Sequence, residues 1–259
     1  MILKDIDVHI IAGQSNAVGC TNISTLPNDF KKETFEKAYL YQEGNFSTET
    51  FAKLVKGVSL GMGCWSGQMG IEYGISKVLN NHDDKPFALI RYAFGGSSLC
   101  YDWVPRINWA HKPCFIGHRG FHYMSWSKAV YNGLMELINK GYKPTIKSLI
   151  WMQGETDAGL NESIANEYYD SLRDLIFSMR TELNLPELKI IVGEIATKAP
   201  QVPYSDVVRN AQKKFCETDK NSYLVSTKDI PIGKDGLHFD GEEDIKLGEA
   251  FGKAIIKSL

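Results

Sequence analysis

The chain has 259 residues, of which 43% are hydrophobic and 23% are charged, so it is long enough to bury one substantial core. Its 29 basic and 31 acidic residues leave a formal net charge of -2 without long runs of either sign, which argues against a surface for nucleic acid or an anionic membrane. The five cysteines are scattered and lack a CxxC spacing, which favours free thiols over a disulfide framework. We therefore expect a single domain over residues 1–259.

The first residues give no targeting signal. Residues 1–7 alternate charged and apolar side chains and lack a basic stretch followed by a long apolar run, so no signal peptide is predicted. No apolar stretch approaches the roughly 20 residues that cross a bilayer. A cytoplasmic protein is the expectation, although a secreted chain from which a leader has been removed would have the same sequence.

Apolar runs and helical patterns alternate along the chain. The apolar, β-rich runs are residues 8–12, 87–93, 146–152, 188–195 and 223–226. Helical periodicity marks residues 71–80, 126–139, 164–183, 207–217 and 243–257. Because parallel strands need crossover connections, this alternation predicts an α/β fold, namely a three-layer α/β/α sandwich with a five-stranded parallel sheet. Residues 20–70 and 95–123 interrupt the alternation and are expected to be insertions that shape a substrate site.

Four of the five predicted strands end in residues that can do chemistry. These residues are Ser15 after the first run, Gly95 and Gly96 after the second, Gln153 and Glu155 after the third, and Asp235 and His238 after the fifth. Ligands of open α/β sheets bind beyond the carboxyl ends of the strands, so we expect these residues to meet there. Together they supply a nucleophile, a base, carboxylates and oxyanion donors, which is the inventory of an acyl-transfer enzyme.

Each of these residues has an expected role. A serine hydroxyl is a weak nucleophile alone, so Ser15 needs His238 as its base. The short spacing from Asp235 to His238 lets a carboxylate approach the imidazole from the same side. Gly95 or Gly96 and the backbone N–H of Ser15 are expected to bind the developing oxyanion, with the Gln153 amide as a third donor.

The motifs also resemble a known family. The stretches GQSN (13–16), GG (95–96), WMQGETD (151–157) and DGLHF (235–239) together resemble the SGNH/GDSL hydrolase superfamily. Within it they are similar to the carbohydrate acetylesterase branch, which includes acetyl xylan esterases of carbohydrate esterase family 6 and sialate O-acetylesterases. This resemblance implies a flavodoxin-like fold, removal of an acetyl group from a sugar through an acetyl-serine intermediate, and no metal or organic cofactor. The implied partner is an acetylated small molecule or oligosaccharide.

The resemblance implies Ser15 as nucleophile, His238 as general base and Asp235 as the orienting acid, with Gly95 or Gly96 as the oxyanion glycine. Gln153 stands where the superfamily has its name-giving asparagine, and it keeps the amide donor on a longer arm. Some members of the branch use the glutamate of the QGE motif to orient the histidine. Asp235 and Glu155 are therefore both candidates for that acid.

Further side chains are expected at the substrate. They are Gln14 and Asn16 beside the nucleophile, Trp65 and Trp103 in the insertions, and Arg119 in the second insertion. An indole face can stack on a sugar ring, and a guanidinium can bind the carboxylate of an acidic sugar in two places.

Two other functions compete with the esterase. One is a zinc-dependent hydrolase built on a cluster of possible ligands, His111, Cys114, His118 and His122. That segment departs from the usual zinc-ligand spacings, and a serine triad needs no metal. The other is a catalytically silent carbohydrate-binding protein in which the motifs persist without productive geometry.

Overall fold

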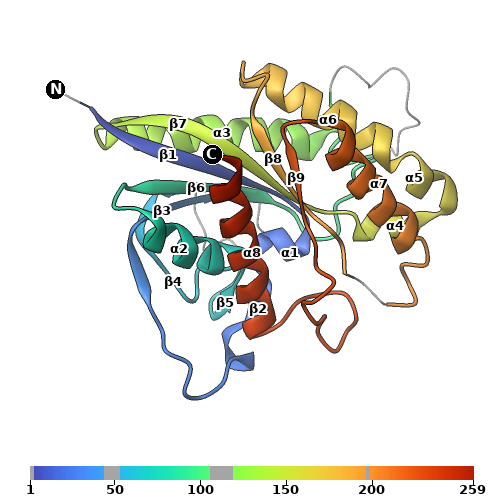
Figure 1. Cartoon of the computed structure of the whole chain (residues 1–259), viewed down its shortest axis with the longest axis horizontal. Coiled ribbons are helices and arrows are strands. Elements are labelled where there is room, and N and C mark those ends of the chain that lie inside the picture. The colour runs from blue at the N-terminus through green and yellow to red at the C-terminus, as the bar shows by residue number, and fades with distance from the viewer. Residues whose placement is uncertain (1–2, 44–52, 106–118, 197–198) are drawn as a thin grey trace.

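The computed structural model describes residues 3–43, 53–105, 119–196 and 199–259, and its sheet runs through the centre of the molecule (Figure 1). Within these residues the central sheet has seven strands in the order β4-β3-β6-β1-β7-β8-β9. Their bounds are β1 (Lys4–Gly13), β3 (Thr34–Glu43), β4 (Val55–Ser59), β6 (Phe87–Ala93), β7 (Tyr142–Met152), β8 (Lys189–Gly193) and β9 (Ser222–Val225). Neighbouring strands are parallel except for the antiparallel edge pair of β3 and β4.

The predicted α/β sandwich is confirmed, but its strand count is wrong. The five expected strands correspond to β1, β6, β7, β8 and β9, whereas β3 and β4 come from residues 20–70, which we expected to be an insertion. Polar side chains such as Lys37 and Gln42 interrupt the apolar run of β3, and Lys56 and Gly57 interrupt β4. β4 is an edge strand, where one side is unpaired and such residues are common, whereas β3 is paired on both sides. In both strands the polar residues weaken the apolar pattern. A separate antiparallel pair joins β2 (Thr21–Asn22) to β5 (Gln68–Met69).

Helices cover both faces of the sheet (Figure 1). On one face lie α3 (Phe121–Asn139), α6 (Tyr168–Glu182) and α7 (Ser205–Thr218), whose Trp126, Leu175 and Val208 share a buried cluster with Ile10 of β1. On the other face lie α2 (Ile71–His82) and α8 (Glu242–Ser258), which bury Ile11 of β1 in a second cluster. Adjacent residues of β1 thus enter different cores, as expected of a central parallel strand. None of the helices described here is long and apolar enough to cross a membrane.

The helix boundaries differ most from the expectation in two places. The helix expected over residues 126–139 begins five residues earlier, at Phe121, and the one expected over 164–183 is divided into α5 (Glu162–Asn166) and α6. Two short helices follow strands at the carboxyl edge, α1 (Ser15–Val18) after β1 and α4 (Glu155–Leu160) after β7. A short 3-10 helix covers Ile23–Thr25.

The register of the sheet brings three strand ends to one level. Gly13, the last residue of β1, pairs with Ala93 of β6 and with Met152 of β7. Gly13 has φ +144°, and a Cβ at this position would lie 1.9 Å from the Met152 carbonyl oxygen. Only glycine fits this close backbone contact. The chain therefore leaves β1 tightly against β7, and Ser15 emerges beside the loops that follow β6 and β7.

Candidate active site

Ser15, His238 and Asp235 form one hydrogen-bonded chain at the carboxyl edge of the sheet. Nε2 of His238 lies 2.9 Å from Oγ of Ser15, and Nδ1 of His238 lies 2.6 Å from Oδ2 of Asp235. Ser15 is the first residue of α1 and is 8% exposed, whereas the side chains of His238 and Asp235 are 36% and 54% exposed. The imidazole thus lies between the hydroxyl and the carboxylate, as proton transfer from a serine requires.

The loop before α8 holds this carboxylate and imidazole together. Oδ1 of Asp235 accepts hydrogen bonds from the backbone N–H groups of Leu237 (2.8 Å) and His238 (2.9 Å), and the N–H of Gly233 donates to the His238 carbonyl (2.7 Å). Gly236 has φ +69°, which closes the turn at little steric cost. Burial alone would raise the pKa of Asp235, but the N–H donors and His238 outweigh it, and the pKa lies below its ordinary value. Asp235 is therefore held as a charged acceptor.

Glu155, the other candidate acid, does not contact the imidazole through a hydrogen bond. It is 2% exposed, and its Oε1 accepts from Nδ2 of Asn16 at 2.7 Å. Burial raises the pKa of Glu155, although the nearby His238 works in the opposite direction. Of the two carboxylates that the motifs indicated, Asp235 lies at Nδ1 of His238, whereas Glu155 is bonded to the side chain of Asn16.

Asn16 bonds to other parts of the protein and not, as expected, to the substrate. Its side chain is buried, and Nδ2 donates to Glu155 and to the Leu237 carbonyl (3.2 Å), while Oδ1 accepts from the Phe239 N–H (3.3 Å). All the polar atoms of its amide are therefore used within the protein. The expectation that Asn16 binds substrate is corrected: it ties α1 to the loop that carries His238.

Gln14 is also occupied within the fold. It is 3% exposed, and its Oε1 accepts from the N–H groups of Gly154 and Thr156, at 3.3 Å each. Its own backbone N–H donates to the Met152 carbonyl at 2.9 Å. Gln14 thus joins the end of β1 to the start of α4, and this position corrects the expectation that its side chain binds substrate.

The loop after β6 brings backbone donors to the nucleophile's edge of the sheet. Gly95 is partly exposed, and Gly96 is exposed with φ +70° and has open space where a side chain would be. The N–H of Ser15 begins α1 and has no intrahelical acceptor. That these backbone groups bind an oxyanion stays a prediction.

Gln153 does not supply the third donor. It is fully buried, and Nε2 donates both to the Ser97 carbonyl (3.1 Å) and to Oδ2 of Asp157 (2.6 Å). Because both amide hydrogens are used, the expected role of Gln153 at the oxyanion is corrected. Its Oε1 accepts from the Tyr168 hydroxyl at 3.0 Å, so Gln153 instead fixes the loop that contains Gly95 and Gly96.

Two aspartates that the motifs did not single out for catalysis hold the same loop. Asp157 is 1% exposed and accepts from the N–H groups of Leu99 (2.7 Å) and Cys100 (3.0 Å). Asp102 accepts from both the N–H (2.7 Å) and the hydroxyl (2.8 Å) of Ser98. The position of Asp157 in the WMQGETD stretch is the signal that could have identified it; Asp102 had no comparable signal.

The two tryptophans expected at the substrate differ in position. Trp103 is fully buried, donates from Nε1 to the Ser97 hydroxyl (2.8 Å) and packs edge-on against Trp151, so its expected role at the substrate is corrected. Trp65 is 46% exposed and follows Cys64, which contacts Cys20 close to α1. Arg119 is partly buried and precedes Gly120, the N-cap of α3.

Most of the candidate zinc cluster lies outside the described residues. His111, Cys114 and His118 fall within residues 106–118, which the structure does not describe. His122 is 6% exposed, its Nδ1 lies 2.8 Å from the Tyr92 hydroxyl, and its ring stacks on Phe94 at 4.3 Å. Among the described residues, no group of three or more His, Cys, Asp or Glu side chains is placed to hold a metal ion.

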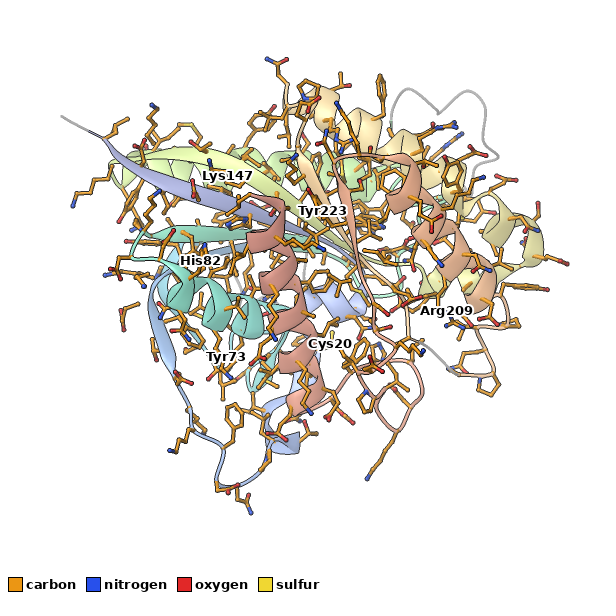
Figure 2. All side chains as sticks on the ribbon, viewed as in Figure 1. Cys20, Tyr73, His82, Lys147, Arg209 and Tyr223 are labelled. Atoms are coloured by element: carbon orange, nitrogen blue, oxygen red, sulfur yellow. The ribbon has the colours of Figure 1, made fainter. Side chains whose placement is uncertain are left out.

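A cavity of about 610 Å³ lies at the same edge of the sheet, where β8 and β9 end. Glu194 follows β8, Ser226 follows β9, and Arg209, labelled in Figure 2, comes from α7. Ile232 also lines the cavity and precedes Gly233 of the loop that carries His238. The walls thus combine hydroxyl, charged and aliphatic groups.

Known proteins share this fold. A probable carbohydrate esterase from Arabidopsis thaliana, At4g34215, is 30% identical over 148 residues, which are 56% of this chain and 55% of that protein. The sequence match thus spans about half the length of this curated relative. The solved structure of the Arabidopsis protein matches with a TM-score of 0.73 and 22% identity over 98% of both chains.

Two further solved structures match over nearly the whole chain. NanS matches with a TM-score of 0.68 and 14% identity over 99% of this chain and 98% of that one. A carbohydrate acetylesterase from Xanthomonas citri matches with a TM-score of 0.60 and 17% identity over 96% of this chain and 55% of that one. At these identities the structural matches show a shared fold. The family model described as carbohydrate esterase, sialic acid-specific acetylesterase matches residues 5–257, and the chain therefore belongs to that family of carbohydrate esterases.

Proposed function

We propose that this protein is a serine esterase that removes O-acetyl groups from a carbohydrate through an acetyl-serine intermediate. The observation that carries the proposal is the unbroken hydrogen-bonded chain from Ser15 through His238 to Asp235. It occurs in a member of a carbohydrate esterase family, at the edge of the sheet where ligands of such folds bind.

In the proposed acylation step, Nε2 of His238 takes the proton of Ser15 as Oγ attacks the acetyl carbonyl carbon. The carbonyl oxygen becomes an oxyanion, which the N–H groups of Ser15 and of Gly95 or Gly96 bind. The imidazolium then gives its proton to the departing sugar oxygen, and the acetyl group stays on Ser15. Asp235 stabilises the imidazolium through the bond at Nδ1.

In the proposed deacylation step, water takes the place of the sugar. His238 removes a proton from the water, whose oxygen attacks the acetyl-serine carbonyl, and the same N–H groups bind the second oxyanion. Return of the proton to Oγ of Ser15 releases acetate. Neither step requires a metal or an organic cofactor.

A carbohydrate substrate is supported by the family and by the surroundings of the triad. The exposed Trp65 offers an aromatic face, and the cavity beside the His238 loop has hydroxyl and charged walls. Release of acetate from acetylated xylan oligomers and from O-acetylated sialic acids should be compared directly. Preference for the sialic acids would assign a cationic side chain, with Arg119 as the first candidate, to the sugar carboxylate.

The nucleophile is tested by Ser15→Ala. This variant should fold normally and show negligible turnover of p-nitrophenyl acetate, while turnover near that of the parent would refute the assignment. Ser226→Ala, on the rim of the cavity, is the matched control and should keep its turnover of this small ester.

Two further measurements separate the esterase from its competitors. Labelling of Ser15 by a fluorophosphonate contradicts a silent binding protein, because the reagent reacts only with an activated serine. Elemental analysis and a chelator distinguish a zinc-dependent hydrolase, whose activity would fall with the loss of metal from the segment of His111, Cys114 and His118.

A further inference from the structure

Two cysteines lie in contact beside the candidate active site. Sγ of Cys20 lies 3.9 Å from Sγ of Cys64, and Figure 2 shows Cys20 next to α1, the helix that begins with Ser15. Cys20 is partly exposed and Cys64 is 2% exposed, so a small reagent reaches the pair from the side of Cys20. Cys100 and Cys216, the other cysteines in the described part of the chain, form no disulfide.

The backbone around the two cysteines is tightly packed. The N–H of Cys64 donates to the Gly19 carbonyl at 2.8 Å, so the segments that carry the two thiols are already joined. Gly19 has φ +89°, and a Cβ there would lie 3.0 Å from Nη1 of Arg91 and 3.2 Å from Cα of Gly63. This contact between glycines holds the segment after α1 against the segment before β5.

The surroundings also favour ionisation of one of the two thiols. The Cys20 thiol donates to the Cys64 sulfur and, together with the nearby Arg91 guanidinium, lowers the pKa of Cys64 against the effect of burial. Donation to Cys64 and burial raise the pKa of Cys20. A thiolate next to a second thiol is the arrangement in which oxidation ends in a disulfide.

We propose that Cys20 and Cys64 are a reversible oxidation site, at which a peroxide converts the thiol pair into a disulfide that slows the esterase. The Cys64 thiolate attacks one oxygen of hydrogen peroxide and breaks the O–O bond, which leaves a sulfenic acid and, with one proton, water. The Cys20 sulfur then attacks the Cys64 sulfur, the S–O bond breaks, and hydroxide leaves with the Cys20 proton as water. Two thiols are oxidised, and one peroxide is reduced to two waters.

The disulfide would act on the nucleophile through α1. An S–S bond is about 2.05 Å long, so the sulfur atoms must approach from their separation of 3.9 Å. Gly19, which links Cys20 to α1, is already bonded through its carbonyl to the N–H of Cys64 at 2.8 Å, so a movement of Cys20 toward Cys64 acts on the segment directly after α1. The displacement is therefore passed back along the four residues of α1 to Ser15, whose bond to His238 depends on the position of that helix.

The test begins with a readout that does not use activity. The full-length reduced protein is treated with hydrogen peroxide, alkylated and digested without reductant, and its peptides are analysed by mass spectrometry. We expect a peptide pair joined through Cys20 and Cys64 and lighter by two hydrogens, which disappears after dithiothreitol. Free or singly oxidised thiols at both positions, with no joined peptide, would overturn the proposal.

The second readout rests on the proposed function. We expect oxidation to lower kcat for p-nitrophenyl acetate by about 10-fold to 100-fold, because a misplacement of about 1 Å can cost about 100-fold, and dithiothreitol to restore it. A joined peptide with unchanged kcat would overturn the proposal that the disulfide slows the esterase. If the reduced protein has no esterase activity at all, the proposed function fails, while the joined peptide still reports on the thiol pair.

Matched variants show that the effect belongs to this pair. Cys64→Ala should form no joined peptide and should keep its kcat in peroxide, and Cys20→Ser provides the same test if the buried alanine variant does not fold. Cys216→Ser removes a thiol far along the chain and should oxidise and slow like the parent. Equal inactivation of Cys64→Ala and the parent by peroxide would assign the loss to another residue.

Discussion

The identity of the acid can be decided by a pair of isosteric substitutions. Asp235→Asn keeps an acceptor for the N–H groups of Leu237 and His238 but removes the charge that faces Nδ1 of His238. Glu155→Gln keeps an acceptor for Asn16 and leaves the contacts of the imidazole unchanged. We expect the first substitution to slow the enzyme and the second to leave its rate close to that of the parent.

The size of the loss follows from the bond at Nδ1. A hydrogen bond to a charged group contributes about 1.5–3 kcal/mol, which corresponds to a decrease in kcat of about 10-fold to 150-fold. A buried triad aspartate can contribute as much as about 10⁴-fold, but the Asp235 side chain is 54% exposed, and water replaces part of its effect. For Glu155→Gln we expect a change within about threefold, because the new amide adds no contact to the imidazole.

The assay is initial-rate hydrolysis of p-nitrophenyl acetate by both variants and the parent, with circular dichroism and urea unfolding to verify that each is folded. A folded Asp235→Asn that retains its rate, together with a folded Glu155→Gln that loses tenfold or more, would refute the reasoning. Glu155 would then be the acid, acting on His238 in an arrangement other than the one described here.

Three further predictions concern stability and substrate binding. Gly13→Ala should lower the free energy of unfolding by about 4 kcal/mol or more in urea titrations, because its methyl group would lie 1.9 Å from the Met152 carbonyl oxygen. Burial raises the pKa of Asp244 far above its unfolded value of about 3.9, so the folded state retains a proton that the unfolded chain releases. The free energy of unfolding should therefore fall as the pH rises from the unfolded pKa to the folded pKa of Asp244. Asp244→Asn should flatten that pH dependence. Trp65→Ala should raise KM for acetylated oligosaccharides about threefold to tenfold and leave KM for p-nitrophenyl acetate unchanged, whereas equal effects on both would contradict sugar stacking.

The central sheet could be predicted because its strands are buried on both faces. Such strands are continuous apolar runs, and β1, β6 and β7 are recognisable from their residues alone. β3 carries lysine and glutamates between apolar positions, the edge strand β4 carries lysine and glycine, and the pairing of β3 depends on partners in both β4 and β6. A pattern within one segment cannot contain that information.

The site could be predicted in outline for a related reason. Strand ends converge in any parallel sheet, so Ser15 and His238 could be expected to meet without knowledge of distances. Whether a polar side chain near the site faces the substrate or the protein depends on its available partners. Gln153 and Asn16 are each surrounded by complementary groups from other elements, and Trp103 is fully enclosed, which no spacing in the sequence indicates.

The hydroxyl and imidazole that meet at 2.9 Å are 223 residues apart in the chain. During synthesis the serine leaves the ribosome early, but it has no base until the loop before α8 has been made and has docked beside α1. Under the proposed function, a nascent or partly folded chain therefore hydrolyses no ester. In a refolding experiment, the onset of ester hydrolysis would report when the loop before α8 docks beside α1. Labelling by a fluorophosphonate would measure the fraction of fully folded molecules in a mixture with incompletely folded ones.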